Sequence, residues 1–426
     1  MVKNEKQHIE KTRARQGSRA DSPEPYKIAA STPFDFGAKN LSPYGGLFPV
    51  ATMLEKLGFK KLVEESLTIR RIPRAMTIYQ FLLGMVLAIY IGFSRLNHLR
   101  FVAQDPMLTG VLQVGELPPQ CTFWRFLTAL PLTVAQQLLK LQRLLRERVW
   151  EAANVQLPSI TLDTDTTVHT LYGRQMGARK SYNPKNKGKK SYQPILTFIA
   201  ETREYIGGEL RNGDRPTGAQ IARHLEAVFA AVPRCVSKIY ARADAGFYCW
   251  EAVQAYEKAK ASFLIVARKT ARLLEELEKA DWRPSPKTDA DEQCEFQYQP
   301  EGWGKAYRFI ALRYQKKDEA PKEQYQLWET AEYINRVFVT DMKDAIELLV
   351  WVYNQRAGAE NLIKLRPEKL LEMIVWQGGP TKPRIPLRVA YEVGAARQRT
   401  VRSPRTMYPH SQEWRQNREV TMYLPA

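Results

Sequence analysis

The sequence predicts an α/β protein: a mixed sheet flanked by helices and carrying a β-rich insertion, preceded by an all-α N-terminal domain. Apolar residues recur at helical spacing from Leu47 to about Asn154, which predicts the helical part. From Ser159 onward, apolar and polar residues alternate with period two, which is typical of a strand. Later strand patterns are separated by helical patterns, and this succession is typical of an α/β sheet.

The chain is strongly basic. Its 64 Lys and Arg residues against 45 Asp and Glu residues give a formal net charge of +19. Such a field favours a polyanionic partner. We expect double-stranded DNA rather than a membrane surface, because the sequence shows neither a lipidation signal nor a basic amphipathic helix. The apolar stretch 76–93 is interrupted by Gln80, so we expect a buried helix there rather than a membrane span.

The cysteines and the N-terminus bear on the compartment. The four cysteines form no C-x-x-C pair, which argues against a zinc site or a disulfide framework. The N-terminus is too polar for a signal peptide. Together these features predict a cytoplasmic protein with reduced thiols.

Two segments precede the predicted sheet. Residues 1–45 are polar and basic, then rich in Pro, Ser and Gly, and they predict a disordered basic arm. Residues 46–155 predict a helical domain. We expect this domain to bind DNA by placing a helix in a groove, and a packing domain without groove contact is the alternative.

Residues 156–270 predict the first part of the α/β core. Asp163 and Asp165 lie on one face of its first strand, where Asp is disfavoured. Either metal coordination at the strand end or a strand edge facing water explains the pair. A later buried strand ends at Asp244 and is followed by a turn with Gly246 and a helix, which is where open α/β sheets place their ligands.

A turn-rich basic segment lies between these strands, and tyrosines are interleaved with its cations. It is either a surface that follows DNA phosphates or a solvated loop. The candidate DNA-binding residues of this segment are Arg174, Lys180, Lys185, Lys187, Lys189 and Lys190. After the core strands, residues 271–335 alternate like strands and predict the β-rich insertion.

Residues 336–364 predict the last strand and helix of the core. At about 100° per residue, Tyr353, Arg356, Glu360 and Lys364 fall on or near one face of that helix. Such a face suits a carboxylate that holds a metal ion beside groups that hold phosphate. The alternative is an exposed helix with an Arg356–Glu360 ion pair.

Three carboxylates therefore occupy distinct places: Asp165 on the first strand, Asp244 at a later strand end, and Glu360 on a helix after an insertion. This arrangement matches the plan of RNase H-like nucleases. Such a triad can hold two divalent cations, and carboxylate oxygens suit Mg²⁺ or Mn²⁺.

A set of motifs resembles one family across residues 47–364. The motifs are residues 162–167 (LDTDTT), 172–175 (YGRQ), 177–178 (GA), 182–184 (YNP), 242–247 (RADAGF) and 353–364 (YNQRAGAENLIK). They resemble the DDE transposases of bacterial insertion sequences, in particular the group-one DDE domain with a β-strand insertion. The resemblance implies that Asp165, Asp244 and Glu360 are the catalytic and metal-binding residues. It selects Asp165 over Asp163 because a Ser/Thr pair follows the family's first acidic residue.

The same resemblance implies the reaction and the partners. The reaction would be hydrolysis of a phosphodiester at transposon ends, followed by strand transfer into target DNA by a homodimer at the bacterial nucleoid. Arg356, with Tyr353, would contact a phosphate near the cut. Either Lys364 or Lys369 would replace the family's downstream Lys, whose position Pro367 occupies. Trp303 is a candidate for holding a flipped base, and packing within a hairpin is the alternative.

The C-terminal residues 365–426 depart from the family. Leu365-Arg366-Pro367 interrupts the predicted helix, and proline inside a helix costs about 3 kcal/mol or more. We hypothesise that the reading frame shifted near Lys364, and translating the other frames of the gene beyond this residue tests the hypothesis. Two other functions therefore stay open: a non-catalytic DNA-binding protein, decayed or recruited, and a structure-specific nuclease without preference for terminal repeats.

Overall fold

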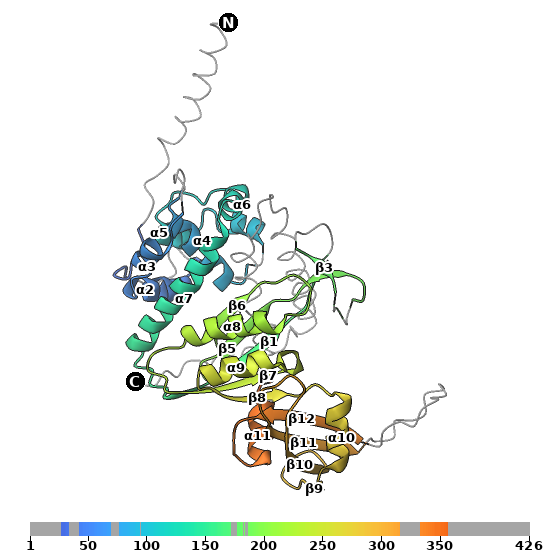
Figure 1. Ribbon diagram of the computed structural model, residues 1–426. Helices are drawn as coiled ribbons and strands as arrows, with labels where there is room; N and C mark the ends of the chain where they lie inside the picture. Colours follow the sequence, from blue (N-terminus) through green and yellow to red (C-terminus); the bar gives the residue numbers. More distant parts are fainter. Residues whose placement is uncertain are drawn as a thin grey trace, which may run out of the picture. The chain divides into compact units, whose positions relative to one another are not determined.

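The computed structural model describes residues 27–33, 42–69, 76–93, 95–171, 177–181, 183, 186–315 and 333–356. The chain divides into two compact units, of which the first comprises residues 1–138 and 372–426 and the second residues 139–371. Helix α7 (Leu132–Ala152) begins in the first unit and ends in the second (Figure 1).

The described secondary structure of the first unit is helical. Besides the start of α7, it consists of α2 (Leu47–Lys56), α3 (Phe59–Ser66), α4 (Ile78–Tyr90), η1 (Leu96–Phe101), α5 (Pro106–Leu112) and α6 (Gln120–Thr128). Gln80, which interrupts the apolar run, forms a reciprocal capping box with Thr77 at the start of α4. Phe81 of α4 stacks on Phe126 of α6, with ring centroids 4.6 Å apart. No helix within the described ranges is long and apolar enough to cross a membrane.

The second unit is built on a nine-stranded sheet with the order β6-β5-β1-β7-β8-β12-β11-β10-β9 (Figure 1). Its strands are β1 (Ser159–Thr166), β5 (Ile195–Ile199), β6 (Glu204–Glu209), β7 (Lys238–Ala243), β8 (Ser262–Val266), β9 (Arg283–Pro284), β10 (Glu292–Tyr298), β11 (Tyr307–Gln315) and β12 (Tyr333–Thr340). The three central strands β1, β7 and β8 are parallel, and the strands on both sides pair antiparallel. The predicted mixed sheet is therefore confirmed.

Helices cover both faces of this sheet, as the α/β prediction requires. They are α8 (Gly218–Ala230), η2 (Ala245–Phe247), α9 (Trp250–Lys258), α10 (Ala271–Lys279) and α11 (Ile346–Asn354). One core cluster joins α8, α9 and α10 to one face, with Phe263 and Phe309 fully buried. A second cluster joins α11 to the opposite face through Phe338 and Leu349. Each fully buried side chain of this size contributes about 1.5–3 kcal/mol, so both layers stabilise the sheet.

The segment 271–335 begins with a helix and then continues the main sheet. Thr270 caps α10 by accepting a hydrogen bond from the Leu273 backbone N–H. Leu273 and Leu277, one helical turn apart, are buried against the sheet. Strands β10 and β11 pair with each other, and β11 pairs with β12. The alternating pattern of this segment thus marks strands that widen the core sheet.

The basic segment after β1 forms more than a loop. A small sheet with the order β2-β4-β3 is built from β2 (His169–Leu171), β3 (Arg179–Lys180) and β4 (Lys190–Tyr192). Gly213 packs against it so closely that a Cβ there would lie 2.4 Å from the Ser191 carbonyl oxygen. Arg179 pairs with Asp214 at 2.7 Å. These contacts tie the small sheet to the loop before α8.

A buried histidine makes the stability of the second unit depend on pH. Thr164, Thr197 and His224 form a hydrogen-bonded chain, with Oγ1 atoms 3.0 Å apart and His224 Nε2 2.8 Å from Thr197 Oγ1. Burial lowers the pKa of His224 to about 4. Below about pH 6.5, His224 binds a proton in the unfolded chain but stays neutral in the folded chain. The free energy of unfolding therefore falls as the pH falls toward 4.

His224→Gln is expected to lose the contribution of His224 to this dependence. Between pH 7.5 and pH 5 the wild type should lose about 2 kcal/mol more unfolding free energy than the variant, because the glutamine does not titrate. Urea unfolding at both pH values, followed by tryptophan fluorescence, measures the difference. Equal losses in the two proteins would show that His224 is not the titrating group.

Candidate active site

Asp165 and Asp244 lie at the carboxyl ends of adjacent parallel strands. In the β1–β7 pairing, Thr164 is opposite Ala243, and each aspartate is the next residue along the chain. Asp244 also caps η2, because its Oδ1 accepts the Gly246 backbone N–H at 2.9 Å. A Cβ at position 246 would lie 2.9 Å from that oxygen, so a larger residue there would displace the Asp244 carboxylate. The carboxyl ends of parallel strands are where α/β sheets bind ligands.

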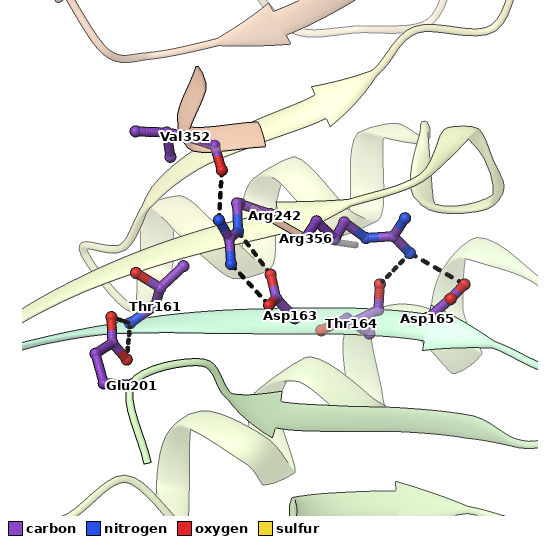
Figure 2. A network of polar contacts seen from close by, with 8 residues as sticks. All are labelled: Thr161, Asp163, Thr164, Asp165, Glu201, Arg242, Val352 and Arg356. Carbon is purple, nitrogen blue, oxygen red and sulfur yellow. Dashed lines mark hydrogen bonds and ion pairs between the residues drawn. The ribbon is translucent and has the colours of Figure 1, made fainter. Parts of the chain in front are cut away.

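Arg356 joins this edge from the residues after α11. Its Nη2 lies 3.1 Å from Asp165 Oδ1 and donates a hydrogen bond of 3.3 Å to the Thr164 carbonyl oxygen (Figure 2). The side chains of Arg356 and Asp165 are 7 % and 17 % exposed. Burial alone lowers the pKa of Arg356, but the negative charge of Asp165, followed by Tyr353 and Asp244, raises it above its ordinary value. The guanidinium therefore interacts with both aspartates.

Tyr353 lies beneath Arg356. Its ring is buried against Phe338, with centroids 4.8 Å apart. The guanidinium carbons of Arg336 and Arg356 lie 4.9 and 5.9 Å from the ring centroid. Arg336 also donates to the Asn354 side-chain oxygen at 3.0 Å. These contacts fix the C-terminal end of α11 over the sheet.

The second aspartate of β1 has a different set of contacts. Asp163 makes two hydrogen bonds with Arg242 of β7, of 2.6 Å to Nε and 2.7 Å to Nη2, and Arg242 also donates to the Val352 carbonyl oxygen (Figure 2). Asp163 is 2 % exposed and Arg242 is 4 % exposed. Burial raises the pKa of Asp163, and the hydrogen bonds and charge of Arg242 oppose that rise. This ion pair connects β1, β7 and α11.

The comparisons with known proteins identify the family. The family model described as transposase DDE domain group 1 matches residues 28–371. The chain belongs to this family. A search of curated proteins finds no match. Among solved structures, the chain is similar to the cryo-EM structure of a piggyBac transposase synaptic complex with hairpin DNA, at 12 % identity and a TM-score of 0.38, over 89 % of this chain and 84 % of that chain.

In this transposase, the predicted DNA-binding lysines that the structure describes gather at the small sheet. Lys180, Lys187 and Lys189 are exposed and Lys190 is partly exposed, on or beside the small sheet. Four predicted residues lie outside the described residues, namely Arg174, Lys185, Glu360 and Lys364.

Trp303 lies within the main core cluster of the transposase. Its ring centroid is 5.1 Å from that of Tyr248, 5.8 Å from that of Trp250 and 5.6 Å from that of Tyr307. It is 8 % exposed. In the described structure Trp303 therefore packs within the core, and its part in holding a flipped base stays a prediction.

The donor set at the sheet edge fits a hard divalent cation. Asp165 and Asp244 present carboxylate oxygens on adjacent strands, and such oxygens are the ligands that Mg²⁺ and Mn²⁺ prefer. Within the part of the chain that the structure describes, no group of three His, Cys, Asp or Glu residues is placed to hold a metal ion. The third predicted carboxylate, Glu360, belongs to the residues beyond that part.

Sequence reasoning missed the role of Arg242. The available signal was a matching one: Asp163 precedes Asp165 by two residues, and Arg242 precedes Asp244 by two residues. In parallel strands, residues that precede the strand ends by the same number of positions lie side by side. Because Asp165 and Asp244 share one sheet edge, Asp163 and Arg242 are therefore neighbours.

Proposed function

We propose that this transposase hydrolyses a phosphodiester at transposon ends and transfers the freed strand into target DNA, in a reaction that depends on Mg²⁺ or Mn²⁺. The observation that carries the proposal is the placement of Asp165 and Asp244 at adjacent carboxyl ends of β1 and β7, with Arg356 paired to Asp165. A sheet edge with two carboxylates and a guanidinium beside them suits a reaction at a phosphate group.

Asp165, Asp244 and Glu360 would hold the divalent ions. When bound, these ions supply stabilisation of the negative charge that develops on the phosphate. Arg356 offsets the charge of Asp165 beside Asp244, which allows two carboxylates to lie at one sheet edge. Because a planar guanidinium can form two hydrogen bonds with a phosphate, Arg356 is the proposed contact for DNA near the cut once the ions neutralise Asp165.

The partner that we propose is double-stranded DNA at the element ends and at the target. The net charge of +19 favours it, and the exposed lysines on or beside the small sheet support it because lysines can neutralise DNA phosphates. We also propose that the protein acts as a homodimer that holds two ends, and that it works in the cytoplasm at the nucleoid.

Cleavage of the DNA that flanks the gene tests this function. We expect the full-length protein to nick duplexes carrying the flanking inverted repeats in Mg²⁺ or Mn²⁺ and to leave a 3′-hydroxyl, with no cleavage in EDTA. Duplexes with the same composition and a scrambled repeat are the control. Equal cleavage of repeat and scrambled duplexes would favour a structure-specific nuclease.

A second candidate function is that of a non-catalytic DNA-binding protein. The observation that favours it is at the C-terminus: Leu365-Arg366-Pro367 interrupts the predicted helix, and residues 372–426 lie beyond the family match. This candidate predicts binding that weakens steeply with salt and no nicking in either metal. The same set of duplexes therefore separates the two candidates.

A further inference from the structure

We propose that Arg268, just after β8, binds a backbone phosphate of the DNA strand that enters the acidic edge. This inference rests on the proposed function and adds a DNA contact to it. The motifs that identified the edge do not include Arg268.

Arg268 lies at the same sheet edge as the aspartates. Strand β8 is parallel to β7, with Ile265 opposite Ala243, so the chain leaves both strands on one side of the sheet. The Arg268 Nη2 atom lies 3.5 Å from the Ala245 carbonyl oxygen. The guanidinium therefore lies against the turn that Asp244 begins.

The positive charge of Arg268 is not neutralised by a carboxylate within the described part of the chain. Its side chain is exposed, and the Ala245 carbonyl is the hydrogen-bond partner that the structure gives it. Neighbouring arginines differ in this respect. Arg242 pairs with Asp163, Arg356 with Asp165 and Arg272 with Glu301. An arginine held against the catalytic turn with its charge unpaired is suited to bind an anion from solution.

The distance from Arg268 to the two aspartates suits a phosphate that lies close, along the DNA strand, to the phosphate that is cut. Adjacent strands lie about 4.8 Å apart, so the end of β8 is about 10 Å from the end of β1. A single DNA strand carries one phosphate charge per about 3.4 Å of helix axis. If the phosphate that is cut lies at Asp165 and Asp244, another phosphate of the same DNA strand, within about three nucleotides of it, lies near Arg268. Such contacts set the register of DNA without reading its sequence.

Binding measurements with the full-length protein test the contact. Arg268→Ala should weaken binding to the flanking-repeat duplex about 5–10-fold at 0.1 M salt and reduce the slope of log K against log salt by about 1. Arg268→Lys should retain most of the affinity because it keeps the charge. The control is Arg283→Ala, which removes another exposed arginine. Arg283 lies on β9, four strands from β8, and pairs with Asp281. This control should stay within about twofold of wild type.

Replacing single phosphates by neutral methylphosphonates locates the contact and needs no cleavage. The wild type should lose affinity at one or two positions within about three nucleotides of the repeat end. Arg268→Ala should be insensitive at those positions and remain sensitive elsewhere. If the wild type binds the duplex and Arg268→Ala gives the same profile, the inference fails while the proposed function stands. If the wild type shows no salt-dependent DNA binding, the proposed function fails and the inference fails with it.

Discussion

Asp244→Asn is expected to reduce metal-dependent nicking by about a thousandfold or more, which corresponds to at least about 4 kcal/mol of transition-state stabilisation. The amide keeps an oxygen that can accept the Gly246 N–H, so the turn after β7 should persist. Folding stability and DNA affinity should therefore stay close to wild type. Initial rates of nicking at saturating Mg²⁺ and the midpoint of urea unfolding measure the two effects.

Asp165→Asn should be equally inactive but less stable. Asp165 pairs with the buried Arg356 at 3.1 Å, and the amide removes that counter-charge. Leaving the guanidinium poorly paired should cost about 1–3 kcal/mol. Asp281→Asn is the matched control, because Asp281 is an exposed aspartate whose partner is the exposed Arg283. If Asp244→Asn nicks DNA at the wild-type rate, Asp244 is not an active-site residue.

The strands that carry the two aspartates could be predicted because their pattern is local. Period-two alternation predicts a strand from Ser159 onward, and the structure has β1 from Ser159 to Thr166. The apolar run that ends at Asp244 corresponds to β7, with Gly246 in the following turn. What these patterns lack is the pairing of β1 with β7, since paired residues such as Asp163 and Arg242 are 79 positions apart in the sequence. That information came from the family resemblance.

The polar contacts of the site could not be predicted for the same reason. The Asp163–Arg242 pair spans 79 residues and the contact of Arg356 with the Thr164 carbonyl spans 192. A sequence shows that such residues are charged but not which counter-charge each one meets. The sequence predicted that Tyr353 and Arg356 lie on a ligand-binding or exposed helix face, yet both side chains are buried over β1 and β12. Tertiary pairing allows these polar groups to be buried.

Arg242→Met is expected to cause the largest loss of stability, about 3–5 kcal/mol of unfolding free energy. The substitution removes both hydrogen bonds to Asp163 and the donor to the Val352 carbonyl. It leaves a carboxylate that is 2 % exposed without its hydrogen-bonded counter-charge. Asp163→Leu alone should also destabilise the protein, because it leaves the buried Arg242 guanidinium without its carboxylate partner. Urea unfolding of the single variants measures each loss.

The double variant Asp163→Leu/Arg242→Met separates a structural role of the pair from a catalytic one. With no buried charge left, its stability should return to within about 1 kcal/mol of wild type or exceed it, because well-packed apolar residues replace buried ion pairs at little cost. If Asp165 is the first catalytic carboxylate, this variant should nick DNA within about tenfold of the wild-type rate. A stable double variant that binds DNA but does not nick it would reassign that role to Asp163, since the two aspartates share one face of β1 and Asp165 would be intact.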